Sequence, residues 1–272
     1  MNYAKLVNLL SAKDRRERAN LLLKIRLNHL IFDHTPANSG TIPFESFLVH
    51  LKASNSEVYQ FLQPGGEAGG AVEKVRLAFE RIAEQEKLPF PTFYNADRSL
   101  ALLTYALARH LKPDFVLESG VGYGITSALV LLALERNGAG KLLSIDLPPL
   151  SDPAGLSTGL AVSSEFRKRW TLRLGSSTRC LPEIISRSED IDLFISDSAN
   201  VYTLQRFEFK TVYPRLREGG VALFNNIGAK FQEFLQSIGD INFYSIWQLD
   251  KPKCATGLIV KRQADSSSGT MI

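Results

Sequence analysis

The stretch Phe115-Val116-Leu117-Glu118-Ser119-Gly120-Val121-Gly122-Tyr123-Gly124 decides how the rest of the chain is interpreted. An apolar run ends in an acid, and three alternating glycines follow, which predicts a strand, a tight turn and the start of a helix. Glycine accepts positive φ angles and lets a ligand lie against bare main chain, while the following helix presents its N-terminal amides to that ligand. The stretch is therefore typical of a cofactor-binding loop.

The spacing of the glycines argues against a dinucleotide. A dinucleotide-binding loop reads G-x-G-x-x-G, and counted from Gly120 its third glycine would fall at Ile125. Glu118 would also repel a pyrophosphate, whereas a carboxylate suits a ligand that carries an ammonium group and ribose hydroxyls. These features favour S-adenosylmethionine and place an NAD-linked dehydrogenase last. For the loop alone, a turn with a purely structural role remains an alternative.

A second acid, Asp146, ends the next predicted strand, 22 residues after Gly124. In open α/β sheets ligands bind at the carboxyl ends of the strands, and an acid about 20 residues after the glycine loop binds ribose hydroxyls. Glu118 and Asp146 together therefore predict a nucleoside site.

Strands and helices alternate from residue 95 onward, which predicts an α/β fold with a doubly wound, mostly parallel, seven-stranded sheet and helices on both faces. No helix separates the last two strands, so we expect an antiparallel hairpin at one edge, with the last strand antiparallel. The predicted strands span residues 114–118, 141–146, 171–174, 191–196, 220–225, 243–249 and 256–260.

The chain is expected to divide into three parts. Residues 1–94 are predicted to form an N-terminal helical cap, in which residues 35–43 read as a loop because of their prolines, glycine and Asn/Ser residues. Residues 95–262 form the cofactor-binding domain, and residues 263–272 a flexible tail. We expect the acceptor substrate to enter between the cap and a lid formed by the loop Pro148 to Gly159.

Four segments, taken in order, resemble the class I S-adenosylmethionine-dependent methyltransferases. The glycine loop has that family's acid-x-Gly-x-Gly-x-Gly motif, and Leu174-Gly175-Ser176 is similar to the segment after its third strand. Asp197-Ser198-Ala199-Asn200-Val201-Tyr202 is similar to the Asp-Ser-x-His-x-Tyr motif of a small-molecule subgroup, and Leu216-Arg217-Glu218-Gly219-Gly220 precedes the fifth strand. The resemblance covers about residues 95–262, and it implies a Rossmann-like methyltransferase fold with S-adenosyl-L-methionine as cofactor.

The resemblance also implies roles for individual residues. Asp146 would bind the ribose diol, Glu118 the methionine end of the cofactor, directly or through water, and Ser176 the adenine. Helix capping would explain Ser176 as well. The cofactor-binding residues expected on this basis are Glu118, Ser119, Gly120, Gly122, Tyr123, Gly124, Asp146, Leu147, Ser176 and Asp197.

Asp197 is also the candidate catalytic base for an acceptor hydroxyl, with Tyr202 and Asn226 as orienting groups, although a cofactor-binding or structural role for Asp197 stays open. Related sequences tend to have histidine where this chain has Asn200, and often an acidic pair where it has Asn225 and Asn226. An amide neither supplies the charge that holds a divalent cation nor accepts a proton near neutral pH. We therefore expect no metal site, and a metal-independent O-methylation of a small molecule.

Two other functions share this fold. A non-catalytic or regulatory domain would keep the cofactor pocket and lack the chemistry, as the amides at positions 200, 225 and 226 suggest. An aminopropyltransferase would need several acids to hold a polyamine, and the chain offers only Asp197 in the expected region.

The composition of the chain indicates which partners and which cellular compartment to expect. The chain has 32 basic and 28 acidic residues spread along its length, and its net charge of +4 is a mild excess that indicates no nucleic-acid partner. Cys180 and Cys254 show no C-x-x-C spacing, so neither a disulfide framework nor a zinc site is indicated. The N-terminus lacks the apolar segment of a signal peptide, and no apolar run approaches the roughly 20 residues of a membrane span. We expect a cytoplasmic protein that acts on a small-molecule acceptor away from membranes; a homo-oligomer stays open.

Overall fold

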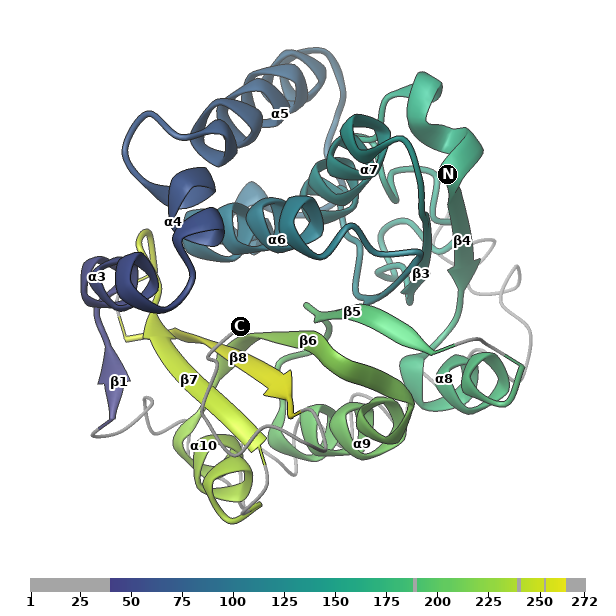
Figure 1. Cartoon of the computed structure of the whole chain (residues 1–272). Coiled ribbons are helices and arrows are strands. Elements are labelled where there is room, and N and C mark those ends of the chain that lie inside the picture. The colour runs from purple at the N-terminus through teal and green to yellow at the C-terminus, as the bar shows by residue number, and fades with distance from the viewer. Residues whose placement is uncertain (1–39, 188–189, 239–240, 252, 263–272) are drawn as a thin grey trace.

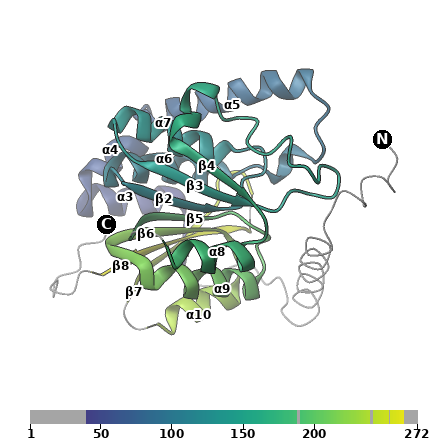
Figure 2. The same cartoon turned by 90° about the vertical axis from the view of Figure 1, so that its right-hand side faces the viewer.

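A computed structural model describes residues 40–187, 190–238, 241–251 and 253–262. Eight strands form one sheet in the order β1-β7-β8-β6-β5-β2-β3-β4. Figures 1 and 2 show the sheet between two layers of helices, with α3 to α7 on one face and α8 to α10 on the other. The strands are β1 (Thr41–Ile42), β2 (Phe115–Ser119), β3 (Lys141–Asp146), β4 (Trp170–Leu174), β5 (Ile191–Ser196), β6 (Leu216–Ile227), β7 (Ile241–Trp247) and β8 (Ala255–Lys261). The helices are α3 (Phe44–Ser54), α4 (Ser56–Leu62), α5 (Glu67–Gln85), α6 (Arg98–Leu111), α7 (Ile125–Asn137), α8 (Ser177–Ile185), α9 (Tyr202–Val212) and α10 (Ala229–Gln236), with short 3-10 turns η1 (Thr92–Tyr94), η2 (Ser164–Arg169) and η3 (Tyr213–Arg215).

The predicted fold class is confirmed. Strands β2 to β6 run parallel, while β8 pairs antiparallel with both β6 and β7. Chain order proceeds outward from β2 through β3 to β4, and then resumes on the other side with β5 and β6. The glycine loop follows β2, at the point where this order reverses, and ligands of open α/β sheets bind at such a point.

An eighth strand was not expected. The sequence predicts a loop over residues 35–43, but Thr41 and Ile42 pair in parallel with Ser245 and Ile246 of β7. The hydroxyls of Thr41 and Ser245 also lie 2.8 Å apart, within hydrogen-bond distance. Two residues are too few to show the alternation that marks a strand, so the sequence pattern misses this pairing.

The core lies on both faces of the sheet. All five residues of β2 are buried, as expected for a central parallel strand that is covered on both sides. Helix α7 is buried from Thr126 to Leu134 with little amphipathic character, because it packs between the sheet and the helices α5 and α6. This packing holds the end of β2 and the start of α7 in fixed positions, and the glycine loop connects them.

The described part of the predicted cap packs on one face of the sheet. Phe47 and Leu51 of α3 and Val58 of α4 are buried in the same apolar cluster as Leu103 and Leu107 of α6. Residues 1–39 and 263–272 lie outside the described residues, and the division of the chain after residue 94 stays a prediction.

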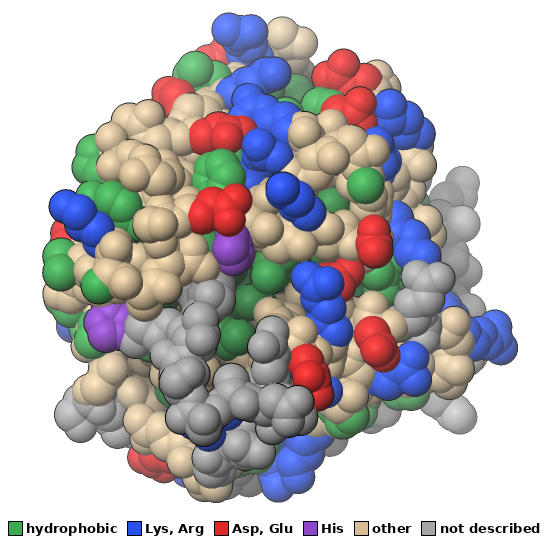
Figure 3. All heavy atoms as spheres, viewed as in Figure 1, with side chains coloured by type: hydrophobic (Ala, Val, Ile, Leu, Met, Phe, Trp, Pro, Cys, Tyr) green, Lys and Arg blue, Asp and Glu red, His purple; other side chains and the backbone are tan. Residues whose placement is uncertain are grey.

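No helix among the described residues combines the length and the apolar character that crossing a membrane requires. Basic and acidic side chains are interspersed on the face shown in Figure 3.

Candidate functional site

A cavity of about 520 Å³ opens at the carboxyl ends of β2, β3, β4 and β5. Three backbone hydrogen bonds continue the sheet just past these strand ends: Gly120 N donates to Ile145 O, Gly175 N to Asp146 O and Asp197 N to Ser119 O. They bring three of the four predicted motif segments, the glycine loop and those at Gly175 and Asp197, to one edge together with Asp146; the segment 216–220 lies at the amino end of β6. The cavity is lined by Phe90, Asn95, Ala96, Ser119, Gly120, Val121, Gly122, Tyr123, Ile125, Thr126, Ile145, Asp146, Leu147, Pro149, Gly175, Ser176, Ser177, Thr178, Asp197, Ser198, Ala199, Asn200 and Leu204.

Two of the three loop glycines are required by close packing. Gly120 has a φ of +88°, and a Cβ there would lie 2.2 Å from the carbonyl oxygen of Asp197. Gly124 has a φ of +84°, and a Cβ there would lie 2.7 Å from Cα of Gly159. Neither position has room for a side chain, and both backbones adopt angles that favour glycine. The loop therefore packs directly against the end of β5 and against the segment that follows β3.

Glu118 does not line the cavity. Its carboxylate is fully buried and accepts hydrogen bonds from Thr126 Oγ1 at 2.5 Å, Ser127 Oγ at 2.5 Å and Ser144 Oγ at 2.6 Å. Burial raises the pKa of this carboxyl, while the three hydroxyls oppose that rise. The structure thus places Glu118 behind the loop, where it joins β2, β3 and the first turn of α7. Contact of its carboxylate with the methionine end of a cofactor would require a rearrangement.

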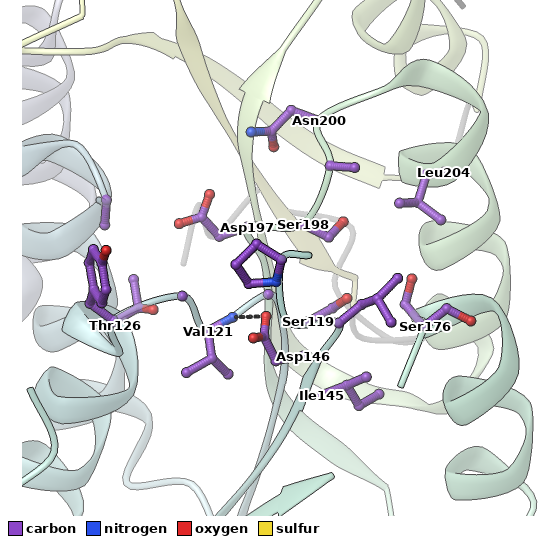
Figure 4. Close-up of a pocket in the computed structure, with 18 of the residues that line it drawn as sticks. Ser119, Val121, Thr126, Ile145, Asp146, Ser176, Asp197, Ser198, Asn200 and Leu204 are labelled. Carbon is purple, nitrogen blue, oxygen red and sulfur yellow. Dashed lines mark hydrogen bonds between the residues drawn. The ribbon is translucent and has the colours of Figure 1, made fainter. Parts of the chain in front are cut away.

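Asp146 reaches the cavity, as the sequence predicts. Its Oδ1 accepts a hydrogen bond from Val121 N at 3.0 Å, which ties the end of β3 to the glycine loop (Figure 4), and its Oδ2 accepts one from Thr158 Oγ1 at 3.3 Å. Asp146 lines the cavity, so its carboxylate is placed to accept a hydrogen bond from a ligand hydroxyl. Leu147 and Ser176, the neighbouring predicted residues, also line the cavity.

Tyr123 closes one side of the site. Its ring stacks on Phe90 with centroids 3.9 Å apart, and its hydroxyl donates to Phe90 O at 2.6 Å and accepts from Phe90 N at 3.0 Å. Phe90 itself lines the cavity, whereas Phe93 is 71% exposed and does not. Tyr123, a predicted cofactor-binding residue, thus brings Phe90 to the cavity wall.

Asp197 lies at the end of β5 in a set of polar side chains. Asn225 Nδ2 donates to its Oδ1 at 2.6 Å, and Gln248 Nε2 in turn donates to Asn225 Oδ1 at 2.6 Å. Burial raises the pKa of Asp197 from its usual 3.8 to about 7; Glu118 and Asp146 add to the rise, and the Asn225 hydrogen bond and the charge of Lys251 oppose it. A carboxylate with this pKa can accept a proton near neutral pH.

The two predicted orienting residues, Asn226 and Tyr202, do not line the cavity. Asn200, which stands where related sequences tend to have histidine, does line it. In the amide orientation that satisfies both of its polar atoms, Asn200 accepts from Asn226 Nδ2 at 3.0 Å and donates to Asn225 O at 3.1 Å. Tyr202 begins α9 and packs against the apolar cluster on that face of the sheet. The orienting roles of Asn226 and Tyr202 stay predictions.

Sequence reasoning missed Glu208. This residue of α9 is fully buried and accepts hydrogen bonds from Ser196 at 2.6 Å, Ser119 at 2.8 Å and Ser198 at 3.0 Å. Its position offered a signal, because residues 204, 205, 208, 209 and 212 form the buried face of α9, and an acid on such a face needs polar partners. The partners come from two other elements, so the sequence did not identify them.

The loop after β3 is attached to the glycine loop rather than free of it. Gly159 N donates to Gly122 O at 3.0 Å, and Ala161 N donates to Tyr123 O at 2.8 Å. Asp152 accepts hydrogen bonds from the backbone amides of Leu156 and Ser157 and thereby shapes the turn between them. The C-terminal part of the predicted lid is therefore anchored; its opening and closing stay a prediction.

Within the described residues, no three His, Cys, Asp or Glu side chains come together in a way that could hold a metal ion.

Comparison with known proteins agrees with this geometry. The sequence profile of a family described as a methyltransferase domain matches residues 117–227, from β2 to the end of β6. Residues 117–227 are therefore similar to a methyltransferase domain. The match contains the glycine loop, Asp146, Asp197 and the amide pair at 225 and 226.

Solved structures share the fold of this chain. The O-methyltransferase TomG from Streptomyces achromogenes, solved with S-adenosylmethionine, is 20% identical with a TM-score of 0.54, covering 71% of this chain and 90% of TomG. An O-methyltransferase from Bacillus cereus, solved with S-adenosylhomocysteine, is 15% identical with a TM-score of 0.54, covering 79% of this chain and 100% of the other. The S-adenosylhomocysteine-bound methyltransferase PaMTH1 from Podospora anserina is 18% identical with a TM-score of 0.51, covering 83% of this chain and 100% of the other. At these identities the similarity establishes the fold, and no curated protein matches the sequence.

Proposed function

We propose that this protein is an S-adenosylmethionine-dependent methyltransferase that methylates a hydroxyl of a small molecule. One observation carries the proposal: the glycine loop, Asp146 and Asp197 meet on a single cavity in a methyltransferase domain. The structural neighbours TomG and the Bacillus cereus enzyme are O-methyltransferases, and the cofactor or its product is bound in both.

The residues present suit this cofactor. Gly120 and Gly122 offer bare main chain to the cavity, and the N-terminus of α7 follows them directly. Asp146 provides a carboxylate for the ribose diol, and Leu147 and Leu204 provide apolar contact for a base. Figure 4 shows Asp146 between Ser176, Ser198 and Leu204 on one side and the carboxylate of Asp197 on the other. A nucleoside bound through its ribose to Asp146 would therefore have its base toward Ser176 and its amino-acid end toward Asp197.

The bound cofactor supplies a methyl group on a sulfonium centre, ready for displacement by a nucleophile. The protein has to align the acceptor, exclude water and remove a proton. Asn225 holds Oδ1 of Asp197, so we assign the proton of the acceptor hydroxyl to Oδ2. Asn95 and Phe90 form the wall on which the acceptor would lie, and Lys251 donates to the carbonyl of Asn95 at 2.8 Å, which fixes that wall.

We propose that the reaction proceeds without a metal ion. The amides of Asn225 and Asn226 supply no negative charge beside Asp197, and one carboxylate is a weak site for Mg²⁺. Addition of Mg²⁺ should therefore leave the rate unchanged, and stimulation that EDTA abolishes would contradict this part of the proposal.

Asp197→Asn tests the proposal, because it keeps the size of the side chain and removes its proton acceptor. We expect transfer of labelled methyl from S-adenosylmethionine to a panel of hydroxyl acceptors to fall at least about 100-fold, much more than the affinity for S-adenosylhomocysteine falls, although Asp197 also faces the amino-acid end of the ligand. The wild-type rate should rise with pH up to an inflection at or below about 7, because the base has to be deprotonated and a cationic cofactor lowers its pKa.

The control is Asp152→Asn, which changes a carboxylate of the nearby loop that does not line the cavity. This variant should keep the pH inflection of the wild type. Failure of calorimetry to detect S-adenosylhomocysteine binding would reject the proposed function, whereas tight binding with no turnover on any acceptor would favour a regulatory domain.

A further inference from the structure

Glu208 lies behind one wall of the cavity and has no part in the transfer proposed above. Its buried carboxylate accepts hydrogen bonds from the hydroxyls of Ser119, Ser196 and Ser198, and the hydroxyl of Ser177 donates to it as well. Of these four serines, Ser119, Ser177 and Ser198 line the cavity. One carboxylate thus lies beneath three hydroxyls on the same wall, and they come from β2, the start of α8 and the end of β5.

This arrangement fixes the hydrogen-bond polarity of the wall. A serine hydroxyl has one proton to donate and two lone pairs with which to accept. Because Ser119, Ser177 and Ser198 each give their proton to Glu208, each of them can only accept a hydrogen bond from a ligand. These three hydroxyls therefore offer acceptors and no donors, and they select a ligand group that carries N–H or O–H bonds.

The position of the wall indicates which part of the ligand meets it. In Figure 4, Ser119 and Ser198 lie on the same side of Asp146 as Leu204, and the carboxylate of Asp197 points to the other side. With the ribose on Asp146, the base extends toward Leu204 and the serines. An apolar side chain beside hydrogen-bond acceptors suits a purine ring that has an amino group at its edge.

We propose that Glu208 is a positioning residue for base recognition, which holds Ser119, Ser177 and Ser198 as acceptors and thereby selects a 6-aminopurine. This inference rests on the proposed cofactor. Glu208 itself touches no ligand. The exocyclic amine of adenine can donate its hydrogens to the serine oxygens of this wall. A purine without that amine leaves these oxygens without a donor from the ligand.

The test compares two ligands by calorimetry: S-adenosylhomocysteine and its 6-deamino analogue, in which unsubstituted purine replaces adenine. The wild-type protein should bind S-adenosylhomocysteine about tenfold more tightly than the analogue, as expected for a lost hydrogen bond in a desolvated site. Glu208→Gln keeps the volume but introduces an amide that donates, so that it forces at least one serine to accept from it and to turn its proton away. The affinity ratio should then fall to about threefold or less, mostly through weaker binding of S-adenosylhomocysteine.

Glu118→Gln is the matched control. Glu118 is an equally buried carboxylate that accepts from three hydroxyls, but it lies on the other side of β2, at the start of α7. Its substitution should keep the tenfold ratio even if both affinities fall. Single Ser→Ala changes at positions 119, 177 and 198 provide a second route that does not depend on the folding of the Glu208 variant, and at least one of them should lower the ratio.

The outcomes separate the two proposals. If the wild-type protein binds both ligands equally well, or if Glu208→Gln and all three serine variants keep the wild-type ratio, the role of Glu208 is rejected and the proposed function stands. If S-adenosylhomocysteine does not bind at all, the proposed function is rejected, and the role of Glu208 is rejected with it.

Discussion

At the scale of single residues, the acids around the cavity differ in exposure: Glu118 and Glu208 are fully buried, whereas Asp197 is partly exposed. Glu118, Asp197 and Glu208 all lie within or next to the wall of one cavity, and burial raises the pKa of each. Glu118 and Glu208 are satisfied by hydroxyls, whereas Asp197 receives a single hydrogen bond from an amide. The first two therefore serve structure and positioning, and Asp197 is the one suited to exchange a proton.

The raised pKa of Asp197 predicts how stability depends on pH. Its pKa is about 7 in the folded protein and near 3.8 in the unfolded chain, so the folded state binds the proton more tightly. The resulting stabilisation is fully present below about pH 4 and is lost as the pH rises through about 7. Between about pH 5 and about pH 8, the free energy of unfolding measured in urea should fall roughly 2 kcal/mol further for the wild type than for Asp197→Asn.

Comparison with Asp197→Asn isolates this residue, because Glu118 and Glu208 titrate in both proteins. Parallel curves for the two proteins would show that Asp197 keeps an ordinary pKa in the folded state, and its role as a base near neutral pH would then lose its support.

At the scale of elements, the glycine loop depends on its contact with the loop after β3. Gly124→Ala puts a Cβ within 2.7 Å of Cα of Gly159, in addition to the strain of its positive φ. Gly138→Ala has a similar φ of +78° but nothing within 4 Å, so it reports the strain alone. We expect Gly124→Ala to lower the free energy of unfolding by about 1 to 3 kcal/mol more than Gly138→Ala does.

The same pair of variants should differ in ligand binding, because only Gly124→Ala displaces the anchored loop from Gly122 and Tyr123. Weaker binding of S-adenosylhomocysteine is expected for Gly124→Ala and not for Gly138→Ala. Equal effects of the two substitutions on the free energy of unfolding would show that the close approach of the two loops does not contribute to stability.

A second element-scale contact joins the helices above the sheet. Glu67 of α5 accepts hydrogen bonds from Tyr105 Oη of α6 at 2.5 Å, from Arg109 Nε at 3.1 Å and from Arg136 Nη1 of α7 at 2.5 Å. Glu67→Gln should lower the free energy of unfolding by about 1 kcal/mol, since these groups are partly exposed and water weakens the ion pairs.

Glu73→Gln is the corresponding control on the same helix. Glu73 pairs only with Arg76, and both side chains are at least half exposed, so its loss should change stability by less than about 0.5 kcal/mol. If chemical denaturation finds the two variants equally stable, Glu67 does not hold the three helices together.

At the scale of the whole molecule, the sequence predicts what is local and misses what depends on distant contacts. Seven of the eight strands follow from short apolar runs, and the positions of Asp146 and Asp197 follow from acids at the ends of two of them. The direction of the Glu118 side chain does not, because Ser144 and Thr126 compete with the ligand for its carboxylate. Glu208 was missed for the same reason: its serine partners lie on other elements. Phe90 was missed as well, because it reaches the cavity by stacking on Tyr123, 33 residues further along the chain.

The short strand β1 protects the edge of the sheet from pairing with a strand of another copy of the chain. Without it, β7 would be the edge of the sheet and would present its unpaired backbone N–H and C=O groups to other chains. Thr41 and Ile42 cover the segment at Ser245 and Ile246, and Thr41 lies 204 residues before its partner Ser245. Protection of this edge therefore comes from a segment far from β7 in the sequence. A variant that loosens α3 would uncover this edge and promote intermolecular strand pairing while the cavity is still intact.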